Sequence, residues 1–189
     1  DGAFENCCEL RKINLGILCE LKAIGCRCFK NCCRLKSIEI PASVEYINSY
    51  AFYGCWSLSN VAFQENSKLR AIMKFSFHGT NLTEFRIMPR VMQIDYGAFE
   101  ETKISRFDVP KGYSRLNVID GIFYSRFRTS LVFCPPYLNV SHLNITENIK
   151  AIEAHAMPCK KIDKITFPAS LKRIGHYAFS RSYVSELDF

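Results

Sequence analysis

The chain has 189 residues, of which 48% are hydrophobic and 23% are charged, so it is long enough for one globular domain or one continuous repeat array. This balance excludes a disordered acidic tail and a collagen-like fibre. The net charge of +7 is spread along the chain instead of forming a clustered basic stripe, so we expect no nucleic-acid partner. No apolar run approaches the roughly 18–20 residues that a transmembrane helix needs, and we expect no membrane insertion of this segment.

The first recurring feature along the chain is an Ala-Phe pair. Its second residue recurs at intervals of 22 to 25 residues, with a single interval of 34. Four pairs are Ala-Phe and four are close variants. In chain order they are Ala3-Phe4, Cys28-Phe29, Ala51-Phe52, Ser76-Phe77, Ala98-Phe99, Ile122-Phe123, Ala156-Met157 and Ala178-Phe179. A constant period of this length predicts one array of about eight stacked repeats over residues 1–189.

A short apolar ladder recurs with the same period and predicts one strand in each repeat. Apolar residues at alternate positions, as in Ile38-Glu39-Ile40, indicate a strand with one buried face. The strands are expected to end on residues 13–15, 38–40, 61–63, 85–87, 107–109, 143–145, 165–167 and 187–189. One such repeat cannot bury its apolar side alone, so the strands are expected to stack in parallel around a continuous core.

One repeat is irregular. The interval between Val109 and Ile145 is 36 residues, about 12 more than the period. The excess falls in residues 117–136, where the apolar runs 118–124 and 130–134 flank a polar turn. This pattern predicts a β-hairpin that protrudes from the array or extends one of its layers.

These repeats resemble the BspA-like leucine-rich repeat, whose pattern is Ser-Val-x-x-Ile-x-x-x-Ala-Phe-x-x-Cys-x-x-Leu-x-x-Ile-x-Ile-Pro. Residues 43–63 carry nearly all of it, with Val44, Ile47, Ala51, Phe52, Cys55, Leu58, Val61 and Phe63. The resemblance covers essentially the whole chain. It implies a right-handed leucine-rich-repeat solenoid in which the hairpin of residues 117–136 is an island insertion.

The same resemblance implies a function and a location. The family occurs on surface proteins of oral and gut bacteria and of parasitic protists, and it implies binding of host proteins or cells without catalysis or a cofactor. The cell surface or secretion is therefore expected, with the cytoplasm as the alternative because some members are intracellular. Residues 1–5 contain neither a basic nor an apolar segment, so no signal peptide is predicted in them.

Ten cysteines are unevenly distributed, and three interpretations remain open for them. Cys7, Cys32 and Cys55 each lie three residues after the Phe of their pair, so stacking places them in one column. The column is a packing ladder of free thiols, or it contains a disulfide that joins adjacent members. The third interpretation is a zinc site formed by Cys26, Cys28, Cys32 and Cys33, whose spacing the repeat already explains.

No catalytic motif occurs in the sequence. His-Glu-x-x-His, Gly-x-Ser-x-Gly and a glycine-rich phosphate loop are all absent, and no acids are paired at matched repeat positions. We therefore expect no enzyme activity.

The positions that the repeat leaves free point away from the core on each strand. Repeat proteins keep the core constant and vary this face, which is their usual binding surface. Its mixture of both charges and neutral polar groups suits a protein partner, a host extracellular-matrix or cell-surface protein being one candidate. The alternatives are an intracellular interaction scaffold and a merely soluble sheet. The candidate residues are Asn14, Glu39, Asn60, Glu84, Arg86, Arg106, Asp108, Lys164, Thr166 and Glu186.

Overall fold

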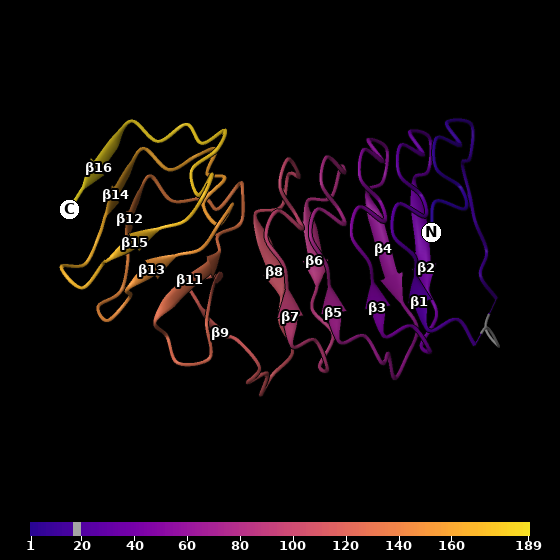
Figure 1. Ribbon diagram of the computed structural model, residues 1–189, viewed down its shortest axis with the longest axis horizontal. Helices are drawn as coiled ribbons and strands as arrows, with labels where there is room; N and C mark the ends of the chain where they lie inside the picture. The colour runs from indigo at the N-terminus through magenta and orange to yellow at the C-terminus, as the bar shows by residue number, and fades with distance from the viewer. Residues whose placement is uncertain (17–19) are drawn as a thin grey trace.

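The computed structural model describes residues 1–16 and 20–189. The chain forms a solenoid of about eight turns, with its two termini at opposite ends of the long axis (Figure 1). The described residues contain strands and turns without a helix, and so include no helix long and apolar enough to cross a membrane. The predicted parallel-strand solenoid is therefore confirmed.

The longer strands follow one another in a row along the array, which we call the first ladder, and they form three separate parallel sheets. It consists of β2 (Ser37–Ile40), β4 (Asn60–Phe63), β6 (Glu84–Arg86), β8 (Arg106–Asp108), β12 (His142–Asn144), β14 (Lys164–Thr166) and β16 (Glu186–Asp188). Neighbours pair in parallel as β2–β4, β6–β8 and β12–β14–β16. Each residue faces the equivalent residue of the next repeat, as Glu84 faces Arg106. The repeat period therefore sets the register, and the alternation of apolar residues sets which face is buried.

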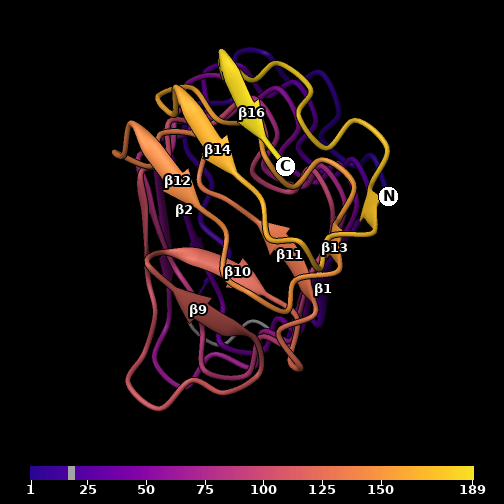
Figure 2. The same cartoon turned by 90° about the vertical axis from the view of Figure 1, so that its left-hand side faces the viewer.

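Two-residue strands form a second ladder on another side of the turns, as the view from the C-terminal end shows (Figure 2). They are β1 (Ala23–Ile24), β3 (Tyr46–Ile47), β5 (Ala71–Ile72), β7 (Gln93–Ile94), β13 (Ala151–Ile152) and β15 (Arg173–Ile174). The isoleucine at the end of each strand from β1 to β13 is buried, whereas Ile174 in the last strand of this ladder is 43% exposed. The isoleucine of one repeat is thus covered by the repeat that follows it.

The core contains a column of stacked phenylalanines. The rings of Phe4, Phe29, Phe52, Phe77 and Phe99 follow one another at centroid distances of 5.2, 5.3, 5.2 and 5.5 Å, with interplanar angles of at most 9°. The backbone amide of Phe52 donates to the carbonyl of Ser76 at 2.7 Å, and that of Phe77 donates to Ala98 at 2.8 Å. A backbone hydrogen bond from this amide to a carbonyl of the next repeat therefore marks the phenylalanine position of a repeat.

The same bond shows that the repeat assignment of Ile122-Phe123 was wrong. Phe123 lies in a strand and packs edge-on against Phe107 at 4.9 Å. The amide that donates to the carbonyl of Ala156 belongs to Cys134, so Cys134 occupies the phenylalanine position of this repeat. A sequence search for aromatic pairs misses it because cysteine replaces the aromatic ring.

The irregular segment has one strand more than the predicted hairpin. Its strands are β9 (Asn117–Ile119), β10 (Ile122–Tyr124) and β11 (Ser130–Phe133), each antiparallel to the next, and β11 continues in parallel with β13. The apolar run 118–124 cannot be one strand because Asp120 and Gly121, with φ values of 50° and 79°, form a turn inside it. The result is a three-stranded meander that extends the second ladder. Its equivalence to the island insertion of the family stays a prediction.

The first predicted strand, over residues 13–15, is absent from the described residues. The side chain of Asn14 accepts a hydrogen bond from the amide of Gly16 at 2.9 Å, and Gly16 has a φ of 74°. A local turn of this kind competes with strand pairing. Cys19, in the same repeat, lies outside the described residues.

Candidate functional site

Nine of the ten residues predicted for the binding surface lie on the first ladder. We call these nine the strand face: Glu39, Asn60, Glu84, Arg86, Arg106, Asp108, Lys164, Thr166 and Glu186. The tenth, Asn14, is exposed but is not part of a strand. Alternation is clearest in β6, where Phe85 is buried while Glu84 and Arg86 are exposed. The role of the ten predicted residues in binding stays a prediction.

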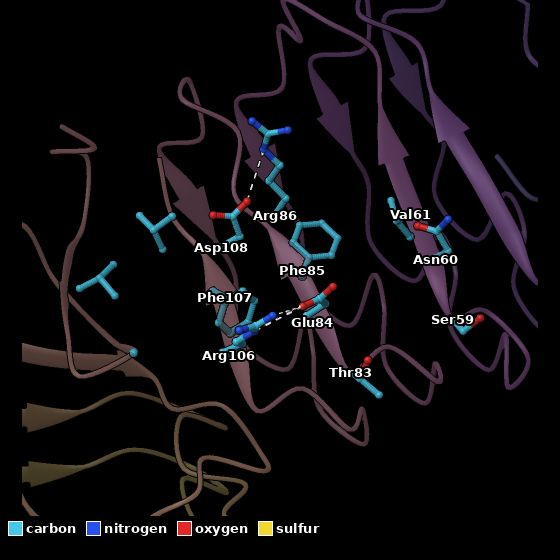
Figure 3. Close-up of a pocket in the computed structure, with 13 residues that line it drawn as sticks. Ser59, Asn60, Val61, Thr83, Glu84, Phe85, Arg86, Arg106, Phe107 and Asp108 are labelled. Atoms are coloured by element: carbon cyan, nitrogen blue, oxygen red, sulfur yellow. Dashed lines mark hydrogen bonds and ion pairs between the residues drawn. The ribbon is translucent and has the colours of Figure 1, made fainter. Parts of the chain in front are cut away.

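The centre of the strand face contains two ion pairs of opposite orientation. Arg106 contacts Glu84 at 2.9 Å, and Arg86 contacts Asp108 at 3.6 Å (Figure 3). In β6 the acid precedes the base, whereas in β8 the base precedes the acid. The hydrogen bond to Glu84 raises the pKa of Arg106. Exposed pairs of this kind contribute little to stability, so their main consequence is a fixed pattern of charge.

A similar pairing occurs nearer the C-terminus. Lys164 of β14 contacts both Glu186 and Asp188 of β16, the latter at 3.6 Å. Its neighbour Thr166 is within 3.2 Å of the imidazole Nε2 of His142 on β12. Charge is thus compensated between adjacent strands along this face as well.

The central ion pairs border a cavity of about 910 Å³. Its walls come from β4, β6 and β8, and Val118 and Gly121 of the meander also line it. Figure 3 shows Phe85 and Phe107 alternating with the paired residues along β6 and β8. Phe85 is buried and Phe107 packs against the core, so the charged side chains, and not the rings, form the exposed surface here. The sequence did not point to Val118 or Gly121, because their contribution depends on where the extra residues fold.

The predicted cysteine column is present as a hydrogen-bonded ladder. The thiols of Cys32 and Cys55 donate to the carbonyls of Phe4 and Phe29 at 3.1 and 3.0 Å. Threonine hydroxyls take over this position later in the array, where Thr80 donates to Phe77 at 2.9 Å. Burial raises the pKa of Cys32 to about 11, which favours the thiol over the thiolate.

The nine cysteines of the described residues are free, and those residues contain no group of three or more His, Cys, Asp or Glu side chains suited to a metal ion. A further cysteine pair was not foreseen from the sequence. Most of the buried apolar residues between Ile122 and Ala178 form a second core cluster, separate from the one that contains the phenylalanine column. In it the sulfur atoms of Cys134 and Cys159 lie 4.0 Å apart, and both residues are fully buried.

A partly buried ionic cluster joins the repeats on either side of the meander. The carboxylate of Glu100 lies 3.1 Å from Nδ1 of His155, and Glu101 contacts Lys160 and Arg181 at 3.7 and 3.3 Å. Burial raises the pKa of Glu100, while the neighbouring His155 opposes that shift. This cluster was not predictable from the sequence, because each acid lies more than 50 residues from the base that it contacts and the partners occupy different repeat positions.

Comparisons with known proteins agree with this geometry. A family model described as "BspA type Leucine rich repeat region" matches residues 1–127 and 132–189 in six copies. No curated protein matches the chain significantly.

Three solved structures are similar to the chain. The pneumococcal vaccine antigen PcpA has a TM-score of 0.75 at 25% identity, over 82% of this chain and 39% of that protein. A leucine-rich cell surface protein from Faecalibacterium prausnitzii has a TM-score of 0.74 at 26% identity, over 85% and 43%. A leucine-rich repeat protein from Eubacterium ventriosum, with 15% identity and a TM-score of 0.63 over 89% and 57%, shows the fold alone. The chain spans less than half the length of the first two proteins.

Proposed function

Because the chain belongs to the BspA-type leucine-rich repeat family, we propose that it is a non-catalytic protein-binding module that serves adhesion or host interaction at a cell surface. Leucine-rich repeats are protein-interaction modules and are generally non-catalytic. The two similar structures with at least 25% identity are described as a vaccine antigen and a cell surface protein. These descriptions support surface display of this chain. A host extracellular-matrix or cell-surface protein is the partner class that we propose.

The strand face is the observation that carries the proposal. It presents both charges in fixed pairs around a cavity of about 910 Å³. A protein surface can match such an alternating pattern with its own charges, whereas a uniform polyanion would meet Glu84 and Asp108 unfavourably.

The test swaps the two charges of one ion pair, so that the pair itself is kept. The double variant Glu84→Arg with Arg106→Glu keeps an exposed ion pair at this position and reverses its direction. Binding of wild type and variant to a panel of extracellular-matrix proteins is measured by surface plasmon resonance. We expect the variant to fold as stably as wild type and to bind its partner at least about tenfold more weakly. Unchanged affinity for every wild-type partner would contradict the proposed role of the strand face.

A second candidate function is an intracellular interaction scaffold that uses the same face. The free state of the nine described cysteines favours it, because exposed thiols persist in reducing compartments. Antibodies against the chain distinguish the two locations when they are applied to intact and to permeabilised cells of the source organism. Surface display predicts labelling of intact cells, whereas a scaffold predicts labelling only after permeabilisation.

A further inference from the structure

The turn between β10 and β11 presents the most exposed large hydrophobic side chain of the described residues. Phe127 is 82% exposed and lies between Arg126 and Arg128, which are also exposed. The guanidinium carbon of Arg126 lies 5.9 Å from the centroid of the Phe127 ring. A single exposed hydrophobic side chain is ordinary on a protein surface, so the evidence for an interaction site comes from the groups that surround Phe127.

This turn is held in place by its own hydrogen bonds. The hydroxyl of Ser125 accepts from the amides of Thr129 and Ser130 at 3.2 and 3.1 Å. The side-chain amide of Asn117, on β9, donates to the carbonyls of Ser125 and Arg126 at 3.2 and 2.7 Å. Phe127 is therefore presented on an ordered loop, so little conformational entropy is lost when a partner covers it.

The cations around the turn have no acidic partners in the described part of the chain. They are Arg115, Arg126, Arg128, Lys150 and Lys172, and none of them takes part in an ion pair there. The amide of Lys150 donates to Thr129 at 2.7 Å and that of Lys172 donates to Lys150 at 2.8 Å, so both lysines continue the row across adjacent strands. On the strand face, by contrast, the arginines are paired. The charge near the turn is thus available to an external partner.

A small cavity lies beside the turn. It has a volume of about 190 Å³ and is lined by Met92, Ser114, Arg115 and Arg126. Met92 is 49% exposed and provides an apolar wall, while the two guanidinium groups provide paired donors. Arginine binds carboxylates in a bidentate manner, and this geometry suits an acidic side chain next to an apolar one.

We propose that Met92, Arg115, Arg126, Phe127, Arg128, Lys150 and Lys172 form a second docking surface, the cationic turn surface, for an acidic protein segment that carries an apolar side chain. Charge complementarity selects an acidic partner, and the apolar contacts of Phe127 and Met92 favour a peptide over a uniform polyanion. This surface involves none of the nine residues of the strand face, so it does not depend on the function proposed for them.

The test is selection of a random peptide library displayed on phage, with the full chain as bait. The counter-selection bait carries Arg126→Glu, Phe127→Ser and Arg128→Glu. A matched control carries Lys68→Glu and Lys103→Glu, which change the net charge equally. Both lysines are exposed outside the cationic turn surface, and neither forms an ion pair within residues 1–16 and 20–189. Arg115→Glu tests the cavity from a different segment and covers the case in which the triple variant does not fold. Thermal unfolding of every variant checks the fold.

We expect enriched peptides in which Asp or Glu flank an aromatic or aliphatic residue. Their affinity should fall at least about tenfold in the triple variant and in Arg115→Glu, and should stay within about twofold in the matched control. Enrichment without acidic bias, or equal loss in the matched control, would overturn the proposal. Binding of the wild type to phosphatidylserine vesicles without any enriched peptide would also overturn it and would indicate a membrane surface instead.

Discussion

Phe52 is fully buried between the rings of Phe29 and Phe77, at centroid distances of 5.3 and 5.2 Å. Its removal leaves a cavity that the stacked neighbours cannot fill without breaking their own contacts. We expect Phe52→Ala to lower the free energy of unfolding by about 3–5 kcal/mol, which urea denaturation measures. Phe127→Ala, at an 82% exposed position, is the matched control and should change it by less than about 0.5 kcal/mol. Similar small effects at both positions would refute the stacked column.

The titration of His78 should be visible in how the free energy of unfolding depends on pH. It stacks on Tyr53 at 4.6 Å, and burial lowers its pKa to about 4, against a smaller opposing effect of Glu101. Below a pH of about 6.5 the unfolded chain takes up a proton that the folded chain refuses until about pH 4. Stability should therefore fall as the pH decreases through this window.

The comparison with His78→Phe isolates this effect, because Phe keeps a ring against Tyr53 and does not titrate. Between pH 7 and 4.5, the wild type should lose about 2 kcal/mol more of its free energy of unfolding than the variant. Chemical denaturation at a series of pH values gives both curves. Parallel curves would show that His78 is protonated equally in the folded and unfolded chain.

At the scale of elements, the end of β11 brings two thiols together. Cys134 and Cys159 have sulfur atoms 4.0 Å apart, whereas Cys32 and Cys55 donate to backbone carbonyls of different repeats. If the chain is refolded with oxidised glutathione as the oxidant, exchange should form a Cys134–Cys159 disulfide and release two molecules of reduced glutathione. Oxidation during folding is required because both thiols are fully buried in the folded chain.

Peptide mapping of the refolded, alkylated protein by mass spectrometry identifies the bond. We expect Cys134–Cys159 to exceed Cys7–Cys32 and Cys32–Cys55, the two pairs that the repeat pattern alone suggests. Cys134→Ser is the control, and it should leave Cys159 alkylated. Predominance of a Cys7–Cys32 or Cys32–Cys55 bond would mean that column position, and not the contact in the second core cluster, decides the pairing.

Elements that follow the period were predictable, and elements that interrupt it were not. The spacing of Ile38, Phe85 and Ile165 predicted strands that the structure contains, because equivalent residues pair in register. The meander differs from the predicted hairpin because the Asp120-Gly121 turn adopts positive φ values inside an apolar run. At the start of the array, the hydrogen bond between Asn14 and Gly16 replaces the predicted strand.

At the scale of the whole molecule, one part of the candidate site was predictable from the sequence and another part was not. The nine residues of the strand face follow from alternation and period, so the sequence could place them on one surface. The contribution of Val118 and Gly121 to the cavity lining, and the contact of Glu100 with His155, depend on how the irregular segment folds back on the array. Such contacts between distant repeats leave no periodic signal.

The central claim is that a protein partner covers the strand face, and carboxyl footprinting of the complex tests it directly. Carboxylates are amidated in solution with and without the partner, and the extent of labelling at each residue is read by mass spectrometry. The account predicts a several-fold loss of labelling at Glu39, Glu84 and Asp108, with unchanged labelling at Glu20 and Glu147, which are exposed outside this face. Loss of labelling at Glu20 and Glu147, with Glu39, Glu84 and Asp108 unchanged, would contradict it.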